Sequence, residues 1–156
     1  MKAWILLFAL LMTAQAESNL ADQCAYIKEA LTKAPPRYTR TARVWVDGRE
    51  RYFERVLVVD GHIEERVRRA HGAEVHFDPG PALPSPNCTT LKQVTKDVWK
   101  AEEPVPAING DRVLTYVFQG DRLIRLRIEE KGSVGFWLLR KPIRFEAVYD
   151  FGEGKP

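Results

Sequence analysis

The chain has 156 residues, of which 24 are Lys or Arg and 21 are Asp or Glu, so its formal net charge is only +3. Charges of both signs alternate with apolar residues, and there is no block of basic residues and no low-complexity tail. This pattern is typical of a solvated sheet face and excludes nucleic acid as an expected partner.

The first 16 residues have the pattern of a cleaved secretory signal peptide. Lys2 precedes an apolar run over residues 3–12, and Ala14 and Ala16 supply the small residues of a cleavage site. The run is shorter than the roughly 20 residues that cross a bilayer, although a retained membrane anchor is the alternative. No cysteine directly follows Ala16. We therefore expect a periplasmic or secreted protein with no lipid anchor and no transmembrane segment after cleavage.

Residues 17–156 are long enough to form a single domain with a hydrophobic core, and this domain is expected to begin with a helix over residues 19–33. Pro35 and Pro36 end the helical pattern. The apolar residues of the segment recur at helical spacing on one face, and they are Leu20, Cys24, Ile27 and Leu31.

The chain has two cysteines, Cys24 and Cys88. In an oxidising compartment such a pair usually forms a disulfide, which here would tie the predicted helix to a segment about 65 residues further along the chain. Two buried free thiols are the alternative.

From residue 38 onward the pattern changes to an alternation of polar and apolar residues, which predicts β-strands. Asp47-Gly48 and Asp60-Gly61 are typical two-residue hairpin turns. A proline-rich loop over residues 78–86 interrupts the pattern. The predicted strands cover residues 38–46, 50–59, 62–70, 73–77, 112–118, 122–129, 133–140 and 143–151.

A second helix is predicted over residues 90–100. Thr90 and Gln93 have the spacing of a capping box, and Leu91, Val94 and Val98 form an apolar stripe.

These elements predict an α+β, mainly β fold, in which a single curved antiparallel sheet of about eight strands forms an unclosed half-barrel. The strands have one apolar and one charged face, and the two predicted helices would cover the concave apolar face. Two short helices leave room for an apolar cavity, which would be a ligand site. A sheet that curls until its own side chains fill the core is the alternative.

Two sets of residues are candidates for binding. The apolar face would contact a ligand through Val44, Val46, Phe77, Tyr116, Phe118, Leu126, Phe136, Leu138, Phe145 and Tyr149. The opposite face would present a partner patch made of Trp45, Trp137, Arg125 and Arg127. Arg140 and Arg144 near Trp137 add charge suited to an acidic partner or to lipid headgroups, with a merely solvated strand face as the alternative.

Two segments carry a resemblance to a known family. They are residues 38–60 (YTRTARVWVDGRERYFERVLVVD) and residues 122–152, which begin with RLIRLRIEE and end with FEAVYDFG. An exported domain with an N-terminal helix, long hairpins, helices inserted in mid-sheet and returning strands resembles the LolA/LppX-like lipoprotein and lipid carriers. The resemblance implies an unclosed barrel that carries or senses acyl chains or lipidated proteins. The chain is short for that family.

No pattern of catalytic residues stands out, so we do not expect an enzyme. His62 and His76, with neighbouring carboxylates, form at best a loose metal site, and exposed histidines are the simpler interpretation. We predict no cofactor and no bound metal.

The function predicted from the sequence is that of an exported, non-enzymatic carrier or sensor of a lipid, a lipoprotein or another apolar ligand. The alternative is an envelope protein–protein interaction domain with a filled core and no ligand.

Overall fold

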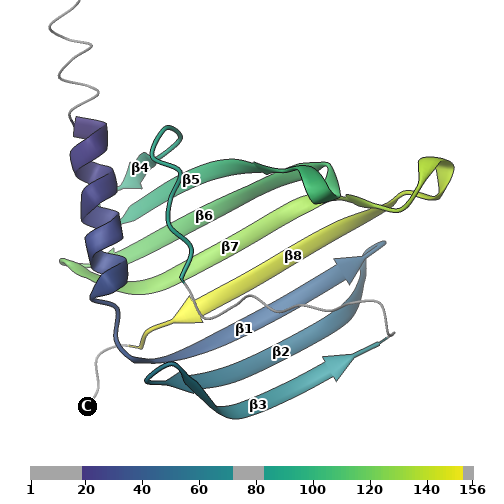
Figure 1. Ribbon diagram of the computed structural model, residues 1–156, viewed down its shortest axis with the longest axis horizontal. Helices are drawn as coiled ribbons and strands as arrows, with labels where there is room; N and C mark the ends of the chain where they lie inside the picture. The colour runs from purple at the N-terminus through teal and green to yellow at the C-terminus, as the bar shows by residue number, and fades with distance from the viewer. Residues whose placement is uncertain (1–18, 72–82, 153–156) are drawn as a thin grey trace, which may run out of the picture.

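The computed structural model describes residues 19–71 and 83–152, which form one helix and a single antiparallel sheet (Figure 1). The helix covers residues 19–32. The predicted signal peptide and the predicted strand over residues 73–77 lie outside the described residues. The strands and the two short 3₁₀ turns are β1 (Arg37–Val46), β2 (Arg49–Val59), β3 (His62–Ala70), β4 (Lys92–Thr95), β5 (Val98–Val105), η1 (Pro106–Ile108), β6 (Gly110–Gln119), β7 (Arg122–Val134), η2 (Trp137–Leu139) and β8 (Lys141–Asp150).

The sheet has eight strands in the order β3-β2-β1-β8-β7-β6-β5-β4. It consists of two meanders, β1–β3 and β4–β8, which are joined where the first strand pairs with the last. That β1–β8 ladder runs from Thr39↔Asp150 to Val46↔Ile143. The prediction of a mainly β fold with one unclosed antiparallel sheet is confirmed, because among the described residues β3 and β4 form two separate edges.

The Asp-Gly dipeptides form hairpin turns as predicted. Asp47 and Gly48 have φ values of 53° and 74°, and Asp60 and Gly61 have φ values of 51° and 79°. Two consecutive residues with positive φ form the turn whose twist matches that of the strands on either side. These turns set the register of the β1–β2–β3 meander.

The prediction of a second helix over residues 90–100 is wrong, because residues 92–105 form the hairpin β4–β5. The hydroxyl of Thr90 does not cap a helix, since it donates to the carbonyl of Glu102 (2.6 Å) and accepts from the amide of the same residue (2.9 Å). The side-chain amide of Gln93 donates to the carbonyl of Lys96 in the turn of the hairpin (3.2 Å). Both groups that suggested a capping box therefore stabilise a hairpin.

The predicted strand over residues 133–140 is also wrong for most of its length. β7 continues to Val134, and residues 135–140 connect it to β8. We call residues 135–140 the tip. Gly135 has a φ of +114°, and a Cβ at this position would lie 2.6 Å from the carbonyl oxygen of Leu139. The chain turns sharply here, so residues 135–140 cannot continue the ladder.

The helix packs on one face of the sheet, which we call the inner face. Its buried residues Cys24, Ile27 and Ala30 belong to the same core cluster as side chains of β6, β7 and β8. In Figure 1 the helix crosses the sheet near one end of β5, β6 and β7. Hence the predicted first helix is confirmed, and it covers only part of the inner face.

The predicted disulfide between Cys24 and Cys88 is confirmed, with a Cα–Cα distance of 5.5 Å. It joins the helix to residues 83–91, which lead into β4. A disulfide fits a protein that resides in an oxidising compartment.

We predict that this disulfide contributes about 4 kcal/mol to the free energy of unfolding, because it links residues 64 apart and so restricts the unfolded chain. Urea unfolding of the wild type with and without reductant measures the effect. The Cys24→Ala/Cys88→Ala variant is the control, since reductant should not change its midpoint. Equal midpoints for the oxidised and reduced wild type would contradict the prediction.

Candidate functional site

The inner face is a continuous apolar surface that extends over β1, β5, β6, β7 and β8. The cross-strand pairs Val44↔Phe145 and Leu126↔Tyr149 place their members side by side on it. Most of its side chains are buried, at 8% exposure or less: Ala42, Val44, Ala101, Leu114, Tyr116, Phe118, Leu126, Ile128, Phe145, Ala147 and Tyr149.

Six of the ten predicted ligand-binding residues lie together on this face: Val44, Tyr116, Phe118, Leu126, Phe145 and Tyr149. Val46 is partly buried at the end of β1 and packs against the same cluster. Phe136 and Leu138 do not join it, because they lie in the tip and are 76% and 99% exposed. Phe77 lies outside the described residues.

An aromatic cluster fills the space between the helix and the sheet. The ring of Tyr26 lies 5.4 Å from that of Phe118 and 6.0 Å from that of Trp99. Trp99 in turn makes an edge contact with Phe118 at 5.2 Å. Aromatic pairs at these separations are favourable beyond the area they bury, so this end of the inner face is tightly packed.

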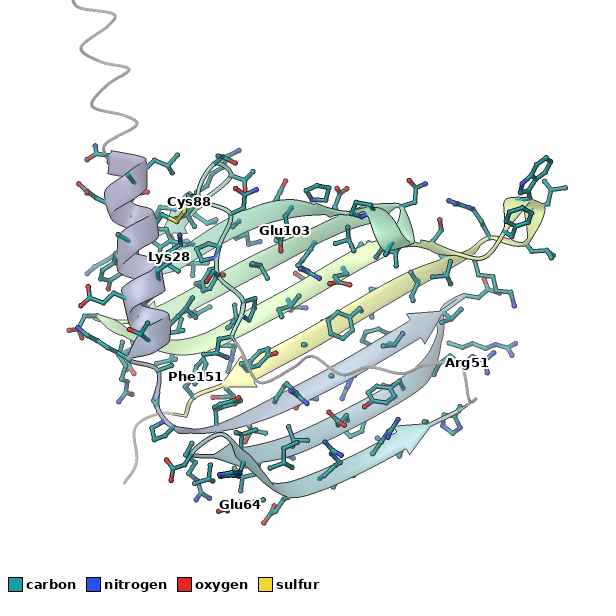
Figure 2. The ribbon with its side chains drawn as sticks, viewed as in Figure 1. Lys28, Arg51, Glu64, Cys88, Glu103 and Phe151 are labelled. Atoms are coloured by element: carbon teal, nitrogen blue, oxygen red, sulfur yellow. A yellow bond between two sulfur atoms is a disulfide. The ribbon has the colours of Figure 1, made fainter. Side chains whose placement is uncertain are left out.

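Residues 83–91 lie on the inner face beside the helix, as the neighbourhood of Cys88 in Figure 2 shows. The hydroxyl of Tyr116 donates to the carbonyl of Pro84 (3.0 Å), and Leu91 is 3% exposed. The disulfide fixes this segment to the helix. Helix and segment together cover the β5–β7 part of the apolar surface.

Towards β2 and β3 the inner face becomes polar around one buried carboxylate. Glu54 is 3% exposed and accepts hydrogen bonds from Nη2 of Arg40 (2.7 Å) and from the hydroxyl of Tyr52 (2.9 Å). Nε of Arg66 lies 3.6 Å from the same carboxylate, and the guanidinium of Arg68 lies over the ring of Tyr52. Three arginines thus surround one acid, which leaves an excess of positive charge beside the apolar surface.

Sequence reasoning missed this cluster, although a signal was present. Strand residues two positions apart point to the same face. Arg40 therefore shares the inner face with Ala42, and Glu54 shares it with Val56. Nε of Arg40 is buried without a hydrogen-bond partner among the described residues.

A second polar group lies on the inner face at the other end of β6. Arg112 forms ion pairs with Glu103 (2.9 Å) and Glu130 (2.6 Å), which are its neighbours on β5 and β7. Two carboxylates face one guanidinium here, so this group closes the apolar surface without offering a free positive charge.

The predicted partner patch on the outer face is not a single patch. Arg125 and Arg127 lie on β7 and form ion pairs with Asp150 (3.6 Å) and Glu146 (2.7 Å) respectively. Trp45 lies further along the sheet, stacked under the guanidinium of Arg144 at 3.9 Å. Trp137 lies beyond the end of β7, in the tip.

An open pocket of about 520 Å³ lies on the sheet next to the tip. Trp45, Lys131 and Arg144 provide its aromatic and charged lining. Lys131 pairs with Arg144 in the β7–β8 ladder and Arg144 pairs with Trp45 in the β1–β8 ladder, so the three are adjacent on the outer face.

The histidines do not form a metal site in the part of the chain that the structure describes. His62 and His71 are exposed at opposite ends of β3, and His76 lies outside the described residues. No group of three or more potential ligands is present among residues 19–71 and 83–152.

The described residues contain no helix long and apolar enough to span a membrane. No protein-family model, curated protein or solved structure matches the chain.

We predict that Tyr52, Tyr116 and Tyr149 ionise at higher pH than free tyrosine. Burial raises the pKa of each phenol above the ordinary value of 10.0, and for Tyr52 the hydrogen bond to Glu54 adds to this. Their contribution to stability is complete below the unfolded-state pKa of about 10 and is lost as the pH rises towards the folded-state values. Tyrosinate absorbance measured against pH should show later ionisation in the native protein than in urea, and Tyr116→Phe should reduce the late phase. Identical curves would contradict the prediction.

We predict that Glu54→Ala lowers the free energy of unfolding by about 3–5 kcal/mol, because it leaves the buried Arg40 without its charge partner. The matched control is Glu146→Ala, which breaks the more exposed pair with Arg127 and should cost about 1 kcal/mol or less. Urea denaturation measures both. The double variant Arg40→Met/Glu54→Leu should recover most of the loss, and equal costs for the two single variants would contradict the role of burial.

Proposed function

We propose that the protein is an exported, non-enzymatic carrier or sensor of a lipid, a lipidated protein or another apolar ligand, and that the inner face is its binding surface. The observation that supports this is the extent of that face. It is apolar over five strands of an unclosed sheet, whereas a single helix is present among the described residues. An unclosed sheet depends on other elements to cover its apolar side, and an acyl chain is a suitable substitute for such a cover.

The cluster around Glu54 makes the β2–β3 end of the inner face polar, while the face is apolar towards β8. Lipids and lipidated proteins combine apolar chains with a polar or anionic group. Arg40, Arg66 and Arg68 provide an excess of positive charge over the single acid Glu54 at the β2–β3 side. We propose that acyl chains lie along β1 and β8 and that the polar group lies towards β3.

The proposed compartment is periplasmic or extracellular, with residues 1–16 removed as a signal peptide. The disulfide supports this part of the proposal. The LolA/LppX-like carriers remain the family that the sequence resembles, and an unclosed antiparallel sheet with an N-terminal helix is compatible with that resemblance.

A second candidate function is that of an envelope interaction domain with a filled core. The observation in its favour is the burial of the inner face, where Ala42, Leu114 and Ala147 are 0% exposed. In that case the side chains already satisfy one another and no ligand enters.

Native mass spectrometry of the gently purified protein, followed by lipid extraction of the same sample, separates the two functions. The carrier proposal predicts additional mass that extraction identifies as acyl lipid. It also predicts that the delipidated protein binds a fluorescent fatty-acid probe, which unlabelled fatty acid displaces. A bare mass together with no probe binding by the folded protein would favour the interaction domain.

Two substitutions on β8 locate the probe. Ala147→Leu adds volume to the inner face and should weaken probe binding, whereas Val148→Trp adds similar bulk to the outer face and should leave binding unchanged. Because overpacking costs about 1–3 kcal/mol, urea midpoints confirm that both variants are folded. Equal probe affinities for the two folded variants would place the ligand elsewhere.

A further inference from the structure

The tip between β7 and β8 exposes four consecutive large apolar side chains. Phe136, Trp137, Leu138 and Leu139 are 76%, 79%, 99% and 78% exposed. The hairpin that carries them extends past the ends of the neighbouring strands (Figure 1), and its side chains extend away from the sheet (Figure 2). These residues therefore contribute almost nothing to the core, and folding does not explain why they are apolar.

The tip has a defined conformation. The amides of Leu139 and Arg140 donate to the carbonyls of Phe136 (3.1 Å) and Trp137 (3.3 Å). Gly135 has no space for a side chain, and Trp137 has a φ of +53°. A bulky residue rarely adopts a left-handed backbone, so the turn holds its apolar side chains outward at a cost in strain.

Positive charge accompanies this apolar tip. Residues 131–145 contain four cations, Lys131, Arg140, Lys141 and Arg144, and no acidic residue. None of the four forms an ion pair with any other described residue, although Asp111 lies opposite Lys131 in the β6–β7 register. This contrasts with Arg112, Arg125 and Arg127 of the same sheet, each of which pairs with a carboxylate. The charge near the tip is thus available to an external anion.

The open pocket next to the tip supplies a place for that anion. Its lining includes Lys131 and Arg144, and the guanidinium of Arg144 is held over the ring of Trp45 at 3.9 Å. An apolar projection with cations immediately behind it matches the layers of a bilayer surface, in which anionic headgroups lie above the hydrocarbon. Tryptophan is also enriched at that boundary. A protein groove, by contrast, has no need of a band of unpaired cations around the inserted side chains.

We propose that the β7–β8 tip is a membrane-docking element that inserts Phe136, Trp137, Leu138 and Leu139 into an anionic phospholipid bilayer. Lys131, Arg140, Lys141 and Arg144 bind the headgroup phosphates, and the pocket beside Trp45 accommodates one headgroup. This docking does not require a ligand on the inner face. It places the protein reversibly at a membrane surface with β7 and β8 leading towards the lipid.

Flotation of the full folded protein with vesicles tests the proposal. The wild type should float with vesicles of phosphatidylcholine and phosphatidylglycerol and should bind vesicles of phosphatidylcholine alone much more weakly. On insertion, the fluorescence of Trp137 should shift to shorter wavelength and be quenched by brominated lipid, and Trp137→Phe should remove most of this change.

Two pairs of variants separate the apolar and the electrostatic parts. Trp137→Ser/Leu138→Ser should weaken vesicle binding by more than about tenfold, whereas Ile63→Ser/Val67→Ser, which changes two exposed apolar residues of β3, should not. Arg140→Gln/Lys141→Gln should weaken binding to the anionic vesicles by about fivefold for each cation removed. Lys96→Gln/Arg122→Gln is its control, because both of these residues are exposed and neither belongs to an ion pair of the described residues.

Three results would overturn the proposal. They are wild-type protein that floats with neither kind of vesicle, tip variants that float like the wild type, and a dimer in sedimentation that the Trp137→Ser/Leu138→Ser variant abolishes. The last would make a second copy of the chain the occupant of the tip. Failure of the carrier function is distinguishable, because displacement of the fatty-acid probe is measured without vesicles and the tip variants should retain it.

Discussion

The pairing of the first strand with the last is the constraint on which the rest of the structure depends. Thr39 of β1 lies opposite Asp150 of β8, and the ladder continues to Val46 and Ile143. Without it the chain would form two separate meanders, and the inner-face side chains of β1 and β8 would no longer adjoin. With it, eight strands share one inner face, and Ala42 and Ala147 meet at its centre as a pair of small, fully buried residues.

Among residues 19–71 and 83–152, a sheet joined in this way still has two edges without a partner strand, and the two edges differ in character. β3 is exposed along its whole length and carries mostly charged residues, which oppose pairing with another chain. β4 is only four residues long. The apolar inner face instead depends on the helix and on residues 83–91, which the disulfide holds together. Covalent attachment compensates for the small area that one helix covers.

Much of the fold was predictable because alternation and turn chemistry are local signals. The Asp-Gly turns and the alternation of β1, β2, β6 and β8 identified these strands correctly, and the pair of cysteines predicted the disulfide. The error over residues 90–100 arose because Leu91, Val94 and Val98 fit a helix as well as a hairpin. In the structure the hydroxyl of Thr90 bonds instead to the backbone of Glu102, and β5 pairs with β6 from Val98↔Val117 to Val105↔Gly110. A contact across a hairpin is invisible to helical periodicity.

The candidate site was predictable in part for a related reason. The rule that alternate residues of a strand share one face correctly placed Val44 and Phe145 together, because both lie in regular strands. It failed at the tip, where alternation assigned Phe136 and Leu138 to the inner face and Trp137 to the outer face. Phe136 to Leu139 are four apolar residues in a row, so they do not alternate. An exposed run of this kind departs from the pattern of apolar and polar residues that is typical of a soluble β-hairpin. Exposed apolar side chains at such a position are expected when they bind something outside the fold. Here the four apolar residues lie among cations that form no ion pair with other described residues. The tip, which fits the fold least well, is therefore the part of the sequence on which the membrane-docking proposal depends.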